Sequence, residues 1–155
     1  MLISNNLRLR EKYLETKIVC IDRNPADLLR VQSILDSHFE LVLISDPTFA
    51  LREMLASPPR ALLFGTDIGG IGAVKLVRHL SEANPSLLNR SLVMTTKEQQ
   101  SEAQLLFDEG AAGLLLKPLN PDSLFTAVRA VLARAKADKL NVQASNQLHF
   151  SPGVV

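Results

Sequence analysis

The stretch EGAAGLLLKPLNP, residues 109–121, carries the signals of a helix end, a strand and a new helix in direct succession. Gly110 is a typical helix stop, because glycine readily takes the left-handed conformation that closes a last turn. Residues 113–116 are mostly apolar, as in a strand buried on both faces. Asn120 and Pro121 then place a capping side chain directly before proline, which is a common helix start. The stretch therefore predicts one strand of a parallel sheet, flanked by helices.

The same alternation of apolar runs and helical patterns occurs four more times upstream. The expected strands are residues 17–21, 39–45, 61–64 and 91–95. The expected helices begin at Pro25, at Pro47, near Ala73 and at Glu98, and Asn84-Pro85 is expected to end the third of them. Five strand–helix units in series predict an α/β fold whose parallel sheet is covered by helices on both faces.

Composition narrows the class of protein. The 155 residues suit one domain, and 46% hydrophobic with 21% charged residues favours a packed core over a disordered chain. A net charge of +1 gives no broadly basic surface, so no nucleic-acid partner is expected. No apolar run approaches the roughly 20 residues of a membrane span, and no signal core precedes the first strand. We therefore expect a cytoplasmic protein without a membrane partner. Cys20 stands alone, which excludes an internal disulfide, and its apolar run predicts a buried thiol.

Both ends of the chain fall outside the alternating pattern. We expect an N-terminal extension over residues 1–16, a domain over 17–136 and a disordered polar tail over 137–155. The extension is compatible with a short amphipathic helix, in which Leu7, Tyr13 and Leu14 are the apolar residues, or with a loose arm.

Polar side chains gather at the predicted carboxyl ends of the strands. In an open α/β sheet these ends meet at one edge, which is where ligands bind. Each residue taken singly is a common loop or capping residue, but their joint placement predicts a shared pocket. The residues are Asp22, Arg23, Asn24, Ser45, Gly65, Thr66, Asp67, Thr95, Thr96, Lys117 and Pro118.

The second half of the chain resembles the receiver domain of two-component response regulators, the CheY-like family. The resemblance is carried by Thr95-Thr96-Lys97, by the stretch 109–118 that ends in Lys117-Pro118, and by the separation of Thr95 from Lys117. It covers about residues 17–136 and implies a flavodoxin-like, doubly wound sheet of five parallel strands in the order 2-1-3-4-5.

Four residues match functional positions of that family. The resemblance implies that Asp22 is one of its paired metal-binding acids and that Thr95 is the hydroxyl that senses the phosphoryl group. It implies that Lys117 pairs with the acceptor carboxylate and that the peptide bond before Pro118 is cis, an isomer that proline tolerates.

Three other positions depart from the family pattern. Arg23 replaces the second metal-binding acid, Gly65 stands where the phosphoacceptor aspartate belongs, and Leu114 replaces the switch aromatic. Glycine has no nucleophile, so no acyl phosphate can form on it. Magnesium requires several oxygen ligands, and Arg23 removes one and adds a repelling charge. We therefore expect a pseudo-receiver, not an enzyme, that binds magnesium weakly or not at all, with Asp22 as the only weak metal candidate.

Two alternatives stay open. Asp67 lies two residues beyond Gly65, and a slipped loop could bring its carboxylate into the pocket as a phosphoacceptor alongside Asp22, with Arg23 or Lys117 as its partner. Otherwise Asp67 is an exposed loop acid. The second alternative is a small α/β nucleotide-binding protein or enzyme, but Ile71 stands where a phosphate-binding loop needs lysine.

A pseudo-receiver implies protein partners, such as a histidine kinase or an output domain. A homodimer is also expected, through the helix over 98–109, the strand over 113–116 and the last helix. Acids on the first helix would meet bases on the last helix of the other copy, and Leu105 and Leu114 would add apolar area; the alternative is a solvated charged surface on a monomer. The charged residues are Glu98, Glu102, Asp108, Glu109, Arg129, Arg134 and Lys136.

Overall fold

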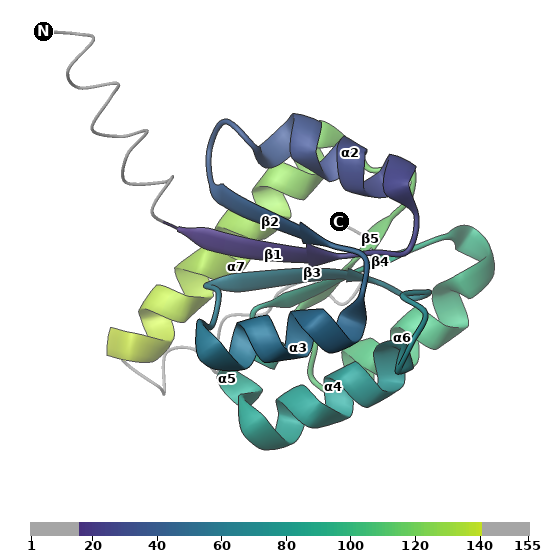
Figure 1. Ribbon diagram of the computed structural model, residues 1–155. Coiled ribbons are helices and arrows are strands. Elements are labelled where there is room, and N and C mark those ends of the chain that lie inside the picture. Colours follow the sequence, from purple (N-terminus) through teal and green to yellow (C-terminus); the bar gives the residue numbers. More distant parts are fainter. Residues whose placement is uncertain (1–15, 141–155) are drawn as a thin grey trace, which may run out of the picture.

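Five parallel strands form a single sheet in the order β2-β1-β3-β4-β5 in the computed structural model, which describes residues 16–140 (Figure 1). This confirms the predicted α/β fold and its 2-1-3-4-5 order. The strands are β1 (Lys17–Ile21), β2 (Glu40–Ile44), β3 (Ala61–Gly65), β4 (Ser91–Thr95) and β5 (Gly113–Leu116).

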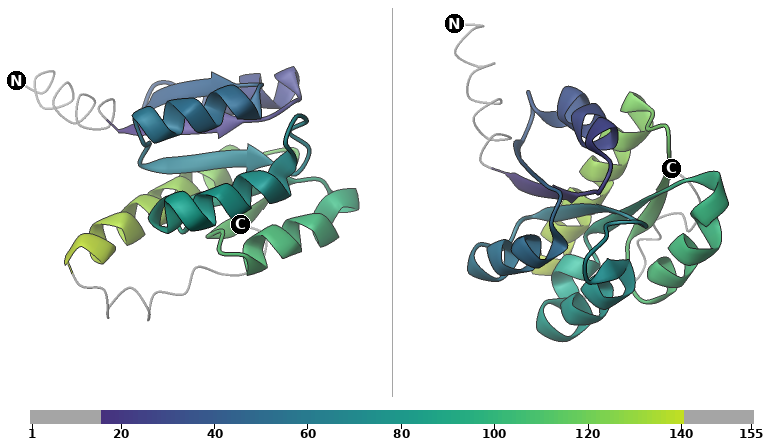
Figure 2. Two further views of the ribbon diagram at one scale, coloured as in Figure 1. Left: turned by 60° about the horizontal axis from the view of Figure 1, so that its bottom comes forward. Right: turned by 45° about the vertical axis from the view of Figure 1, so that its right-hand side comes forward.

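Helices cover both faces of the sheet (Figures 1 and 2). On one face α2 and α7 pack over one hydrophobic cluster, and on the other face α3, α4, α5 and α6 pack over a second cluster. The helices are α2 (Pro25–Leu35), α3 (Pro47–Ala56), α4 (Gly72–Ala83), α5 (Pro85–Leu88), α6 (Gln100–Asp108) and α7 (Pro121–Leu140), and a 3-10 turn, η1 (Lys97–Gln99), precedes α6. Within residues 16–140, no helix combines the length and the apolar character that a membrane span requires.

Side-chain caps explain where the first two helices begin. Asn24 Oδ1 accepts a hydrogen bond from the Ala26 amide at 2.9 Å, and Asp46 Oδ1 accepts one from the Thr48 amide at 2.9 Å. Each cap satisfies one of the amides that the first turn leaves unpaired, and the proline that follows has no amide to satisfy. The caps fix the points at which the chain turns away from the ends of β1 and β2.

The central strands are buried on both faces, as their apolar sequences require. Every residue of β3 and β4 is buried, because helices pack on both sides of them. Cys20 in β1 is fully buried. Burial, and then the negative charge of Asp22, raise the pKa of the Cys20 thiol, so the group stays protonated and unreactive near neutral pH.

Three helix assignments differ from the expectation. Asn84-Pro85 was expected only to end a helix, but Asn84 also caps the next one, α5, by accepting a hydrogen bond from the Leu87 amide at 3.1 Å. The last helix continues to Leu140, so residues 137–140 are helical and not part of a disordered tail. The helix expected over residues 98–109 starts as the 3-10 turn η1. The expectations for residues 1–15 and 141–155, including those for Leu7, Tyr13 and Leu14, lie outside the described residues.

Candidate functional site

A polar cavity of about 430 Å³ lies at the edge where the strands end. Its position follows from the parallel sheet, which brings the carboxyl ends of β1, β3, β4 and β5 together. Loops and the first turn of α2 complete the wall. The lining residues are Asp22, Arg23, Asn24, Asp27, Asp67, Thr96, Glu98, Gln99 and Lys117.

The ammonium group of Lys117 forms ion pairs with two carboxylates, those of Asp22 and Asp27. We call this arrangement the fork. Lys117 Nζ lies 2.8 Å from Asp22 Oδ2 and 2.7 Å from Asp27 Oδ2. Burial by itself lowers the pKa of Lys117, but the hydrogen bonds and charges of Asp22 and Asp27 outweigh it, so the pKa is raised above the usual value. A raised lysine pKa stabilises the fold at all pH values below the ordinary lysine range, and the contribution is lost as the pH rises through the raised pKa. The fork is therefore intact at neutral pH.

Asp22 is buried, and the chain itself engages both of its carboxylate oxygens. Its side chain is 1% exposed, Oδ2 contacts Lys117, and Oδ1 accepts a hydrogen bond from the Asn24 amide at 2.9 Å. A buried carboxylate is stabilised only when a cation or hydrogen-bond donors compensate for the lost water. Both kinds of compensation are present at Asp22.

Gly65 leaves the space that the Asp22 carboxylate occupies. Ile21 of β1 pairs with Phe64 of β3, so the next residues, Asp22 and Gly65, lie side by side. A Cβ atom at Gly65 would stand 2.7 Å from Asp22 Oδ2 and 3.0 Å from Asp22 Cγ, closer than side chains approach one another. A side chain at this position would therefore force the Asp22 carboxylate to move, and no unusual backbone angle is involved.

Asp67 lies at the outer rim of the cavity. Its side chain is 60% exposed, and Oδ1 lies 3.8 Å from Nη1 of Arg23, whose side chain is 70% exposed. An ion pair this open to solvent contributes little to stability. The structure therefore places Asp67 as an exposed loop acid beside Arg23, while Lys117 contacts Asp22 and Asp27.

The predicted hydroxyls are only partly brought to the cavity. Thr95 is fully buried, and its Oγ1 donates to the carbonyl of Thr96 at 3.1 Å. Thr96, which was also expected at the pocket, does line the cavity, and its Oγ1 donates to Gln99 Oε1 at 3.4 Å. Ser45 was expected at the same pocket, but it lines a neighbouring hollow of about 340 Å³ behind Arg23.

Two further positions, Leu114 and Pro118, lie in β5 and just after it. Leu114 is 4% exposed and packs in the hydrophobic cluster beneath α6, so it has no access to the cavity. The peptide bond between Lys117 and Pro118 is cis, the isomer that the resemblance implied.

Two known proteins are similar to the chain in sequence. No family model matches the chain. It is 25% identical over 118 residues to the nitrate/nitrite response regulator protein homolog of Haemophilus influenzae, covering 74% of this chain and 56% of that protein. The chain thus spans little more than half the length of this relative. It is 23% identical over 120 residues to protein PilH of Pseudomonas aeruginosa, covering 76% of this chain and 98% of PilH.

Solved structures agree with the sequence comparison. A response regulator receiver domain protein from Clostridium thermocellum superposes with a TM-score of 0.71 at 21% identity, covering 79% of this chain and 98% of that one. The signal receiver domain of an HD domain-containing protein from Pseudomonas fluorescens gives a TM-score of 0.74 at 18% identity, with 83% and 94% covered. The chain has the fold of a response-regulator receiver domain.

This receiver-like domain contains site residues that its sequence did not reveal. Asp27 reaches Lys117 because it lies one turn beyond the Asn24 cap, where α2 starts at the cavity edge. Gln99 accepts hydrogen bonds from the hydroxyls of Thr66 and Thr96, and so joins the ends of β3 and β4. The cap-and-proline start at Asn24 was a usable signal for Asp27, whereas nothing local marked Gln99.

The polar cavity, which we call the receiver pocket, is lined by more negatively than positively charged side chains. Four carboxylates, from Asp22, Asp27, Asp67 and Glu98, stand against the two cations Arg23 and Lys117, which leaves a formal charge of −2. Among residues 16–140, no three histidine, cysteine or acidic side chains are grouped so that they could hold a metal ion.

Proposed function

We propose that this receiver domain is a pseudo-receiver of phosphorelay signalling, which acts through protein contacts without being phosphorylated and has no enzymatic activity. The observation that carries the proposal is the close approach of Asp22 to Gly65, where a Cβ atom would lie 2.7 Å from the carboxylate. At the position that matches the family's acceptor there is no nucleophile, and another carboxylate fills its space. We expect it in the cytoplasm, with a histidine kinase or an output domain as its partner.

The charges of the pocket support the same proposal. Phosphoryl transfer depends on cations that stabilise the negative charge of the transferring group. Lys117, the cation that matches the family's conserved role, is already neutralised by Asp22 and Asp27. A phosphate donor would therefore meet a net negative surface with no free ammonium group to receive it.

A second candidate function uses Asp67 as the phosphoacceptor, with Asp22 as a metal-binding acid. One observation favours it, because Asp67 and Asp22 line the same cavity. Against it, Asp67 is mostly exposed and lies beside Arg23, and both oxygens of Asp22 are engaged.

Treatment with acetyl phosphate and magnesium is expected to leave the mass of the intact protein unchanged, because Gly65 provides no carboxylate and Lys117 is occupied. Intact-mass spectrometry after incubation is the measurement, with a phosphorylatable receiver domain as the positive control. A phosphoryl adduct that disappears in Asp67→Asn but persists in Asp46→Asn would contradict the proposal and establish Asp67 as the acceptor.

We also propose that magnesium binds weakly or not at all. Titration calorimetry of the wild-type protein is expected to show no binding heat at millimolar magnesium, because Asp22 and Asp27 are both paired with Lys117. Lys117→Met frees these two carboxylates and is expected to gain measurable magnesium affinity. Tight binding by the wild-type protein, or no gain in the variant, would show that Lys117 is not what keeps the metal out.

The expected homodimer stays a prediction, with one correction. Leu105 is 62% exposed and is available for an interface, but Leu114 is 4% exposed and cannot supply interface area. The acidic residues Glu98, Glu102 and Glu109 are exposed, as is Arg129 on α7. Sedimentation at micromolar concentration in low and high salt distinguishes a charge-paired dimer from a monomer.

A further inference from the structure

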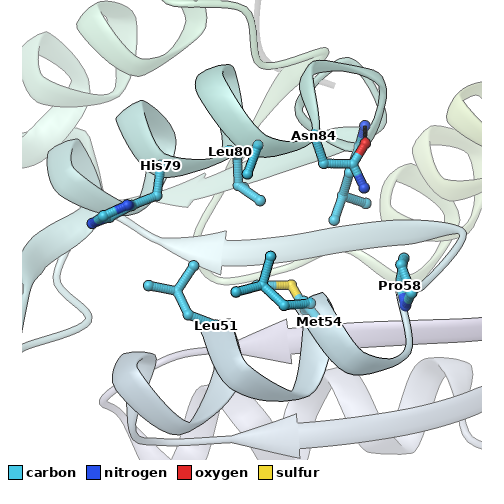
Figure 3. Close-up of a pocket in the computed structure, with 9 residues that line it drawn as sticks. Leu51, Met54, Pro58, His79, Leu80 and Asn84 are labelled. Carbon is cyan, nitrogen blue, oxygen red and sulfur yellow. Dashed lines mark hydrogen bonds between the residues drawn. The ribbon is translucent and has the colours of Figure 1, made fainter.

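A second cavity, of about 310 Å³, lies between α3 and α4 and is apolar (Figure 3). Leu51 and Met54 of α3 face His79 and Leu80 of α4 across it, and Leu87 of α5 also lines it. We refer to this cavity as the α3–α4 groove. Helices that follow parallel strands run back along the sheet, so the ends of α3 and α4 place the groove near the edge where the strands begin, away from the receiver pocket.

The groove offers a ligand apolar surface and few polar groups. Met54 and Leu80 are buried beneath it, whereas Leu55 at its rim is 66% exposed. Asn84 is one of two polar side chains in the lining, and its Oδ1 is already bonded to the Leu87 amide. An occupant would therefore be recognised by apolar side chains that fill the groove and cover Leu55.

The first strand begins beside the end of α3, one of the two helices that form the groove. Lys17, the first residue of β1, donates from Nζ to the carbonyl of Ser57 at 3.2 Å and lies 3.7 Å from Glu53 Oε1. Ser57 precedes Pro58, which lines the groove, and Glu53 precedes Met54, which also lines it. The described part of the chain therefore begins beside the end of α3, one of the two helices that form the groove.

The sequence before Lys17 has the composition that the groove would recognise. Residues 1–14 read MLISNNLRLREKYL, with leucines seven residues apart at positions 7 and 14. An extended chain spans about 3.3 Å per residue, so the residues between Thr16 and Leu7 reach up to about 30 Å, more than the groove requires. The other chain end leaves from α7, which packs with α2 on the opposite face of the sheet.

We propose that residues 1–14 dock in the α3–α4 groove of their own chain, with Leu7 and Leu14 as the anchoring side chains. Because the segment is tethered at Lys17, its effective concentration at the groove is high, so even a weak contact is occupied. The groove is thus proposed as an internal docking site, separate from the receiver pocket.

Methionine methyl signals test this proposal in the full chain. Met54 lines the groove, whereas Met94 is buried on the opposite face of the sheet and reports only that the fold is intact. In Leu7→Ser with Leu14→Ser, the Met54 methyl resonance is expected to shift while that of Met94 stays in place. The matched variant at the other chain end, Leu148→Ser with Phe150→Ser, is expected to move neither. A fixed Met54 signal in the first variant, or a shift in the second, overturns the proposal.

Disulfide trapping distinguishes docking of residues 1–14 within one molecule from occupation of the groove by a second copy of the chain. Cys20 is the only native cysteine and is buried, so engineered pairs can be compared without background. Leu7→Cys is expected to cross-link to Leu55→Cys within one molecule at least tenfold faster than to Leu29→Cys, an equally exposed leucine of α2 at 63%. Equal rates refute docking, and a cross-link that forms only between molecules assigns the groove to a second copy of the chain.

Discussion

Replacement of Asp22 by alanine is expected to lower the free energy of unfolding by about 3 kcal/mol, the lower end of the range for breaking a buried ion pair. The variant loses the 2.8 Å contact to Lys117 and leaves the Asn24 amide without its acceptor at 2.9 Å. Asp27 remains 2.7 Å from Lys117, which keeps the loss from being larger. Urea unfolding followed by circular dichroism measures the change.

Asp67→Ala is the matched control, because it removes an acid from the same cavity. Its ion pair with Arg23 is mostly exposed, so the change in unfolding free energy is expected to stay within about 0.5 kcal/mol. The deficit of Asp22→Ala should be full at neutral pH and shrink as the pH rises through the raised pKa of Lys117, where the wild-type protein loses the same pair. A deficit equal to that of Asp67→Ala would show that the fork contributes nothing.

Gly65→Ala is expected to destabilise the protein by about 1–3 kcal/mol, the usual effect of overpacking a buried site. The new Cβ atom would lie 2.7 Å from Asp22 Oδ2, so either the carboxylate leaves Lys117 or the strands shift. Alanine elsewhere in a strand is at least as favourable as glycine, which makes the loss specific to this contact.

A double-mutant cycle isolates the contact between positions 22 and 65. In the Asp22→Ala background the obstructing carboxylate is gone, so Gly65→Ala is expected to change stability little. The interaction energy should therefore be about 1–3 kcal/mol, within the range for residues in contact. Additive effects of the two changes would mean that the Asp22 carboxylate does not occupy the space above Gly65.

The fold was predictable because its signals are local. Each cap-and-proline pair, such as Asn24-Pro25, acts within one turn, and buried parallel strands need only short apolar runs. The helix α5 was missed for a physical reason, since Asn84-Pro85 ends one helix and caps another with the same two residues. The local sequence pattern does not show whether such a pair only ends a helix or also starts the next one.

The pocket was only partly predictable from sequence. The positions of Asp22, Gly65 and Lys117 followed from strand ends, but their pairing did not. The resemblance implied that Lys117 pairs with an acceptor carboxylate, whereas it contacts Asp22 and Asp27. Which carboxylate a lysine selects depends on side-chain packing between segments far apart in the chain. Ser45 was wrongly assigned to the pocket because β2, at the edge of the sheet, directs its end to a separate hollow.

The fork also ties the end of the first strand to the segment that follows the last strand. Lys117 and Asp22 are 95 residues apart in sequence, and Arg30 of α2 donates to the carbonyl of Leu119 across 89 residues at 3.2 Å. Contacts over such separations close large loops, which slows folding relative to local contacts. A nascent chain can pair β1 with β2 and β3 early, but Asp22 stays a buried acid without its cation until residue 117 has been made. The pocket is thus completed only after the whole sheet has been made, and a product truncated before residue 117 would lack the cation that Asp22 contacts.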